Sequence, residues 1–166
     1  MPSSPVYTER LTSNRTTILF EGLALLFLVL LIWRRSSTGY GWLTTLFFCL
    51  FLFFLFYTLN YRTLRIHCTT KSLILRFGLI YWEIPVENIQ SCSLDETSLR
   101  RIGGAGIHFS TFNGRYRALF NFLEYPRVVI ALKKPRGPVW EIAFSTRQPE
   151  QLISLITAAI TQEATA

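Results

Sequence analysis

The sequence offers few side chains with which to do chemistry. Its 166 residues include two histidines and three cysteines, with no CxxC pair and no cluster at metal-ligand spacing. A GxSxG nucleophile motif, a P-loop lysine and a paired general acid and base are also missing. We therefore expect a non-enzymatic protein with no cofactor and no metal. The odd number of cysteines argues against a disulfide framework and favours free thiols in a reducing compartment.

The N-terminal third of the chain contains two runs that are almost free of charged residues. Residues 40–59 contain no charge, six leucines and six phenylalanines, and a helix of this length matches the ~30 Å hydrocarbon core of a bilayer. Residues 16–33 form a second apolar run whose one acid, Glu21, lies near its end, where a charge costs less than at the bilayer centre. The pattern predicts a two-helix transmembrane hairpin within residues 16–60. A signal peptide is the alternative for the first run, but no small-residue cleavage site follows it.

The basic residues around the hairpin predict its orientation, because lysine and arginine are enriched on the cytoplasmic side of membrane proteins. The connection between the two runs holds Arg34 and Arg35. The segments outside the hairpin hold more basic residues: Arg10, Arg15, Arg62, Arg65, Lys71 and Arg76. We therefore expect a multi-pass protein of the cell (inner or plasma) membrane with both termini in the cytoplasm.

The rest of the chain predicts one small β-rich domain. Residues 1–15 are polar, contain two prolines and are expected to be a disordered tail. In residues 61–162, short β-prone runs alternate with turn residues, and Asn113-Gly114 is a strong hairpin signal. Helical spacing of apolar residues predicts a closing helix at 149–161. The strands are expected at 64–68, 73–77, 79–84, 89–94, 107–111, 116–121, 127–132 and 139–144.

Three stretches of this domain resemble a known family. KSLILRFGLIYWEIPVENIQSCSLDE, RRIGGAGIHFS and FSTRQPEQLISLI are similar to segments of the bacterial and archaeal PH-like (pleckstrin-homology-like) domain proteins, which carry a two-helix membrane hairpin before the domain. The resemblance implies an α+β or all-β PH-like barrel of about seven strands with one C-terminal helix. One departure is Gln148, where the family commonly has an acidic cap. These motifs are structural, so they imply a fold and leave the activity open.

Basic residues are the remaining candidates for a site. They flank the glycine cluster at 103–106 and the Asn113-Gly114 turn, where they could form a basic rim, although solvated surface charge is the competing interpretation. The acidic pair Asp95-Glu96 is interpreted as a solvated loop. The candidate ligand-binding residues are Arg100, Arg101, Arg115 and Arg117.

Three functional hypotheses follow from these features. The leading one is a non-enzymatic integral membrane protein whose cytoplasmic PH-like domain is an interaction or assembly module, with a second copy or another protein as partner. The alternative is that the domain binds anionic lipid headgroups of the bilayer through the basic rim. A third, less favoured, is a transporter or channel accessory subunit that uses Glu21. The net charge of +7 comes without a nucleic-acid-binding motif, so no nucleic acid partner is expected.

Overall fold

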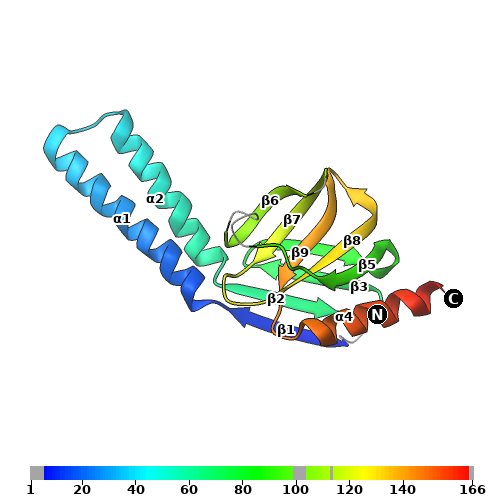
Figure 1. Cartoon of the computed structure of the whole chain (residues 1–166). Coiled ribbons are helices and arrows are strands. Elements are labelled where there is room, and N and C mark those ends of the chain that lie inside the picture. The colour runs from blue at the N-terminus through cyan, green and yellow to red at the C-terminus, as the bar shows by residue number, and fades with distance from the viewer. Residues whose placement is uncertain (1–5, 99–103, 113, 165–166) are drawn as a thin grey trace.

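The computed structural model describes residues 6–98, 104–112 and 114–164, and shows a helical hairpin joined to two β-sheets and a C-terminal helix (Figure 1). The helices are α1 (Asn14–Thr38), α2 (Trp42–Asn60) and α4 (Pro149–Ala164), with one 3-10 turn, η1 (Val86–Asn88). The first sheet contains β1 (Tyr7–Thr12), β2 (Thr63–Cys68), β3 (Ser72–Phe77) and β4 (Ile80–Pro85). The second contains β5 (Ile89–Leu94), β6 (Gly106–Phe112), β7 (Arg115–Asn121), β8 (Arg127–Arg136) and β9 (Val139–Ser145).

Helices α1 and α2 form the expected apolar hairpin. The Ser13 hydroxyl caps α1 by accepting a hydrogen bond from the Thr16 amide at 3.0 Å, as N-cap serines do. Helix α1 extends through Thr38, so Arg34 and Arg35 are helical instead of lying in the connection. Both helices are long and apolar enough to cross a membrane, and the protein itself buries little of either one.

The first sheet is a meander in the order β1-β2-β3-β4. The presence of β1 shows that one prediction from the sequence was wrong. Tyr7–Thr12 were expected to be part of a disordered tail, but they pair antiparallel with β2 along their whole length. The Glu9 carboxylate accepts hydrogen bonds from the Thr146 hydroxyl (2.6 Å) and the Arg147 amide (2.8 Å). Strand β1 is therefore held both by the sheet and by the segment that leads into α4.

The second sheet has the order β5-β8-β9-β7-β6, in which β7 and β9 are parallel and the other pairs are antiparallel. The predicted hairpin around Asn113-Gly114 is confirmed, because β6 and β7 pair from Gly106↔Asn121 to Phe112↔Arg115. Strand β8 continues through Arg136, so the turn before β9 is shorter than expected.

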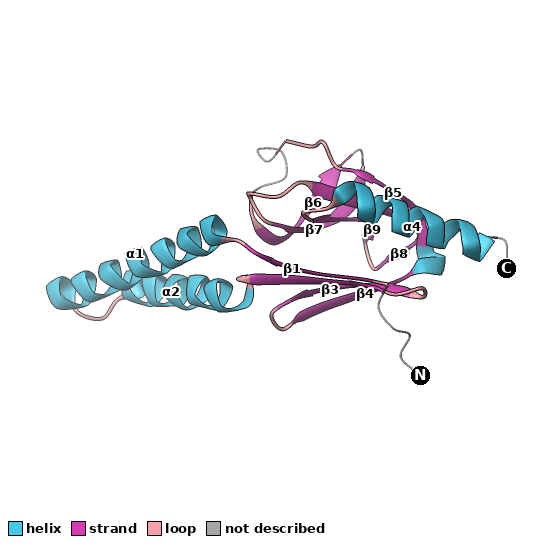
Figure 2. Cartoon of the chain, turned by 90° about the horizontal axis from the view of Figure 1, so that it is seen from below, coloured by secondary structure: helices cyan, strands magenta, loops and turns pink. Residues whose placement is uncertain are grey.

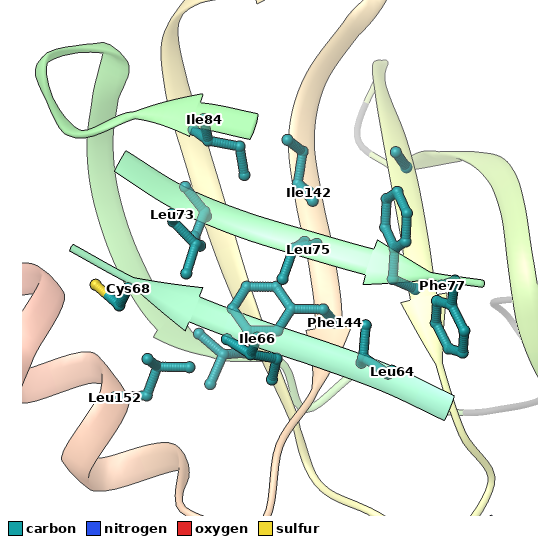
Figure 3. Close-up of a cluster of buried hydrophobic side chains, with 14 of the residues drawn as sticks. Leu64, Ile66, Cys68, Leu73, Leu75, Phe77, Ile84, Ile142, Phe144 and Leu152 are labelled. Carbon is teal, nitrogen blue, oxygen red and sulfur yellow. The ribbon is translucent and has the colours of Figure 1, made fainter. Parts of the chain in front are cut away.

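The predicted closed barrel is not observed. The described strands number nine instead of about seven, and they form two separate sheets. The sheets face each other as two layers, with α4 at the end remote from the hairpin (Figure 2). Side chains of β2, β3, β4, β9 and α4 meet between the layers (Figure 3), and Leu152 and Ile156 of α4 are completely buried there. The fold is thus a two-sheet domain with a C-terminal helix, and the helical hairpin is inserted between β1 and β2 of its first sheet.

The hairpin and the domain are joined by direct continuation and by packing. Strand β1 runs into α1, and α2 runs into β2 (Figure 1). The Tyr57 and Tyr61 rings stack at 4.4 Å between centroids, and Tyr61 contacts Phe77 of the domain core at 5.4 Å. At the other helix, the Glu124 carboxylate accepts a hydrogen bond from the Arg15 amide at 2.8 Å, a favourable place for an anion because helix N-termini carry partial positive charge. These contacts hold β3 of the first sheet and the β7–β8 connection of the second sheet against the hairpin.

Candidate functional site

Three arginines lie in register across the outer face of the first sheet. Arg10 of β1 pairs with Arg65 of β2, which in turn pairs with Arg76 of β3. All three are exposed, because the residues that alternate with them, such as Leu11, Ile66 and Leu75, point into the core. Like charges directly opposite each other destabilise a sheet, and none of the three makes an ion pair within the part of the chain that the structure describes. The row therefore places three cations side by side with no ion-pair partner among the described residues, an arrangement that an external anion would stabilise.

A pocket of about 250 Å³ opens beside this row, at the end of the sheet where the helices leave. Its charge comes from Arg62, which links α2 to β2, together with Arg65 and Arg76. The other lining residues are Leu59, Asn60, Thr63 and Gly78. We call this the junction pocket, and we call Arg10, Arg62, Arg65 and Arg76 the junction arginines.

The shape of the junction pocket depends on a close contact between α2 and the β3–β4 turn. The side-chain amide of Asn60 donates to the Phe56 carbonyl at 2.9 Å, and its oxygen accepts from the Leu79 amide at 3.3 Å. Gly78 turns the chain with φ +52° immediately beside the Asn60 backbone. The Nε of Arg76 donates to the Gly78 carbonyl at 3.0 Å, which holds this guanidinium at the pocket with its two Nη groups still available.

Two exposed apolar side chains lie near the junction pocket. Leu59 near the end of α2 is 72% exposed, and Leu79 in the β3–β4 turn is 79% exposed. Single exposed leucines are common, but here both accompany a cationic pocket at the base of an apolar hairpin. The combination is amphipathic, as is the headgroup region of a bilayer.

The structure separates the arginines that the sequence analysis grouped as a basic rim. Arg100 and Arg101 lie outside the described residues. Arg115 is exposed at the start of β7, with its guanidinium carbon 6.0 Å from the centroid of the Trp140 ring. Arg117 lies on the same strand, but its side chain is only 10% exposed and is bound to carboxylates. Of the two described candidates, only Arg115 is therefore available to a ligand.

The partners of Arg117 form a buried ionic cluster and correct a second interpretation. Asp95 was expected to be solvated, but its side chain is 3% exposed and accepts from Arg117 Nη1 (3.2 Å) and Arg127 Nε (3.0 Å). Arg117 also bonds Glu141 at 2.7 Å, and Arg127 donates to the Thr97 carbonyl. This cluster joins the segment after β5 to β7, β8 and β9. Its charges are satisfied internally, so we assign it a structural role.

Glu21, the acid predicted within the first apolar run, lies on the exposed surface of α1. Glu21 and Arg62 line a common cavity of about 360 Å³, yet they make no ion pair among the described contacts. The neighbouring arginine comes from the linker that follows the two helices.

In the sequence, the junction arginines were used as signals of the orientation of the hairpin. The local pattern places Arg65 between Leu64 and Ile66, and Arg76 between Leu75 and Phe77, so each arginine could have been assigned to the polar face of its strand. Their alignment could not be inferred, because it depends on the registers of β1, β2 and β3.

Comparisons of this chain with known proteins identify no related protein. No protein-family model, curated protein or solved structure matches the chain, so the resemblance to PH-like domain proteins stays a prediction. Among the described residues, no group of three or more histidine, cysteine or acidic side chains is placed to hold a metal ion.

Proposed function

We propose that this chain is a non-enzymatic integral membrane protein whose sheet domain binds anionic lipid headgroups at the bilayer surface. The observation that carries this proposal is the row of three in-register arginines, which have no carboxylate partner among the described residues and lie at the end of the sheet that adjoins the apolar hairpin. The site differs from the rim that the sequence suggested, although the ligand class is the same.

The position of the junction arginines supports binding at the headgroup level. Arg62 follows the last residue of α2 by two positions, and the row lies two residues along the strands from the ends that adjoin the helices. Two residues of extended strand span about 7 Å, which is shorter than the Debye length of about 10 Å at 0.1 M salt. If α1 and α2 span the membrane, the arginines lie within the electrostatic reach of its surface.

The orientation of the hairpin supports the same ligand class. A hairpin with a short connection places β1 and β2 on one side of the membrane, and the distribution of basic residues favours the cytoplasmic side. Anionic lipids give the cytoplasmic surface a negative potential, which attracts each well-placed arginine by about 1 kcal/mol. We therefore place the domain in the cytoplasm, against the inner or plasma membrane.

The first prediction is that neutralising the row weakens binding of anionic lipid. In the full chain purified in detergent, Arg65→Gln/Arg76→Gln should bind dihexanoyl phosphatidylglycerol about 30-fold more weakly, because two cations at about 1 kcal/mol each are lost. Binding is measured by titration with thermal unfolding as the readout.

The matched control for this prediction is Arg115→Gln/Lys133→Gln, which removes the same charge from exposed residues of β7 and β8. This variant should bind the lipid nearly as well as the natural chain. An equal loss in both variants would show that net charge, and not the junction, attracts the lipid, and would refute the proposal.

The leading hypothesis from the sequence, an interaction or assembly module, stays a prediction. Exposed aromatic side chains on β6, β7 and β9, namely Phe109, Tyr116 and Trp140, are of the type enriched in protein interfaces. Crosslinking of native membranes tests it, since recovery of neither a partner nor a second copy would count against it.

A further inference from the structure

We propose that the junction pocket selects a phosphomonoester headgroup, a dianion, over the singly charged phosphodiester headgroups of other anionic lipids. This inference rests on the proposed function and adds the chemical class of the headgroup. It is carried by the charge of the pocket, by the fixed position of one guanidinium and by the apolar side chains at the pocket edge.

The charge of the pocket exceeds that of one phosphodiester. Arg62, Arg65 and Arg76 line the same volume of about 250 Å³, and Arg10 lies in register beside Arg65. No carboxylate makes an ion pair with any of them in the described part of the chain. A phosphodiester carries one negative charge, whereas a phosphomonoester carries about −1.5 to −2 near pH 7 and presents three terminal oxygens. The monoester thus neutralises more of the pocket and offers more acceptors to its donors.

The arginines are arranged to bind those oxygens. A guanidinium presents a planar fork that matches phosphate in bidentate fashion. The bond from Arg76 Nε to the Gly78 carbonyl, at 3.0 Å, positions its fork beside the pocket before any ligand binds. Asn60 is occupied by its bonds to Phe56 and Leu79, so it shapes the pocket instead of contacting the ligand.

The surroundings of the pocket favour a lipid over free phosphate. Leu59 lines the pocket, and Leu79 follows the lining residue Gly78 and bonds Asn60 through its backbone amide. Both are among the most exposed large apolar side chains of the structure. A phosphate attached to acyl chains contacts the guanidinium groups and covers these leucines at the same time. Inorganic phosphate satisfies only the first of these two requirements.

The test compares three probes on the full chain in detergent: dihexanoyl phosphatidic acid, dihexanoyl phosphatidylglycerol and inorganic phosphate. At pH 7.5, phosphatidic acid should bind about 10-fold more tightly than phosphatidylglycerol, measured by the ligand dependence of the thermal unfolding midpoint. This preference should shrink at pH 5, because the monoester gains its second proton with a pKa near 6 while arginine stays charged.

Two variants connect the preference to the pocket. Arg76→Lys keeps the charge but loses the fork, and should lower the affinity for phosphatidic acid more than for phosphatidylglycerol. Leu79→Ser should weaken both lipids and leave inorganic phosphate unchanged. Arg115→Gln/Lys133→Gln again serves as the control, with the preference expected to remain.

The outcomes separate this inference from the proposed function. Equal affinity for the two lipids, with both weakened by Arg65→Gln/Arg76→Gln, would overturn the monoester preference and keep the headgroup site. Binding of neither lipid would overturn both. Inorganic phosphate binding as tightly as phosphatidic acid would overturn the assignment to a lipid.

Discussion

Replacing Asp95 by alanine is expected to destabilise the domain by about 3–5 kcal/mol, because it leaves buried charges without their counter-charge. The side chains of Arg117 and Arg127 are 10% and 7% exposed, and both bind the Asp95 carboxylate. Arg117 would keep Glu141, whereas Arg127 would lose its described carboxylate partner. Chemical unfolding of the full chain, followed by tryptophan fluorescence, measures the change.

The neighbouring acid provides the control for Asp95. Glu96 is exposed, so Glu96→Ala should change the free energy of unfolding by less than about 0.5 kcal/mol. A loss of under 1 kcal/mol for Asp95→Ala would contradict the buried cluster.

The same carboxylate makes stability depend on pH in acid. Burial pushes the pKa of Asp95 up, but hydrogen bonds from Thr97 and Arg127 and the charge of Arg127 outweigh burial and lower it below the ordinary value of 3.8. A folded-state pKa below the unfolded one gives stability that is present above the unfolded pKa and is lost as pH falls through the folded value. The contribution of Asp95 should thus be constant near neutral pH and decline below about pH 4, and Asp95→Ala should remove this part of the decline.

Placing alanine at Gly78 is expected to have the second largest effect, a loss of about 2–4 kcal/mol. A Cβ there would lie 2.6 Å from the Asn60 carbonyl oxygen and 2.8 Å from its Cα, both backbone atoms. The positive φ of +52° adds strain for any side chain. Overpacking costs about 1–3 kcal/mol and a left-handed residue about 1 kcal/mol more. The unfolding free energy and the affinity for phosphatidylglycerol should fall together, because the same turn shapes the junction pocket.

Gly114 separates the two causes of this loss. It also has a positive φ, +76°, but a Cβ there would meet nothing within 4 Å. Gly114→Ala should therefore cost about 1 kcal/mol and leave lipid binding unchanged. Equal losses of unfolding free energy for Gly78→Ala and Gly114→Ala would mean that the contact between the β3–β4 turn and α2 does not contribute to stability.

Local patterns were sufficient to predict most elements of this fold. Long apolar runs predicted α1 and α2, and the Asn113-Gly114 turn predicted the pairing of β6 with β7. Strand β1 was missed because Glu9 interrupts its apolar alternation. The Glu9 carboxylate accepts hydrogen bonds from Thr146 and Arg147. These residues lie near the opposite end of the chain, so no local sequence pattern could predict that Glu9 belongs to a strand.

Pairings that cross long stretches of sequence also decided the candidate site. Arg115 and Arg117 are two residues apart in β7, a spacing that predicts one shared face of the strand, but only Arg115 is exposed. Arg117 lies opposite Glu141 only because β7 pairs in parallel with β9, and Asp95 reaches it from the segment after β5. Conversely, Arg10, Arg65 and Arg76 become one row only when three strands align. The sequence therefore shows which residues are charged. It does not show which of these charges are neutralised by an ion pair in the folded protein.

The central claim is that the junction pocket faces the lipid headgroups, and photocrosslinking in native membranes tests it most directly. A benzoylphenylalanine in place of Leu79, beside the pocket, is compared with one in place of Glu163, near the end of α4 and remote from the hairpin (Figure 2). The proposal predicts phospholipid attached at position 79 and little at position 163, with the attachment reduced by Arg65→Gln/Arg76→Gln. No attached lipid at position 79, or equal amounts at both positions, would contradict it.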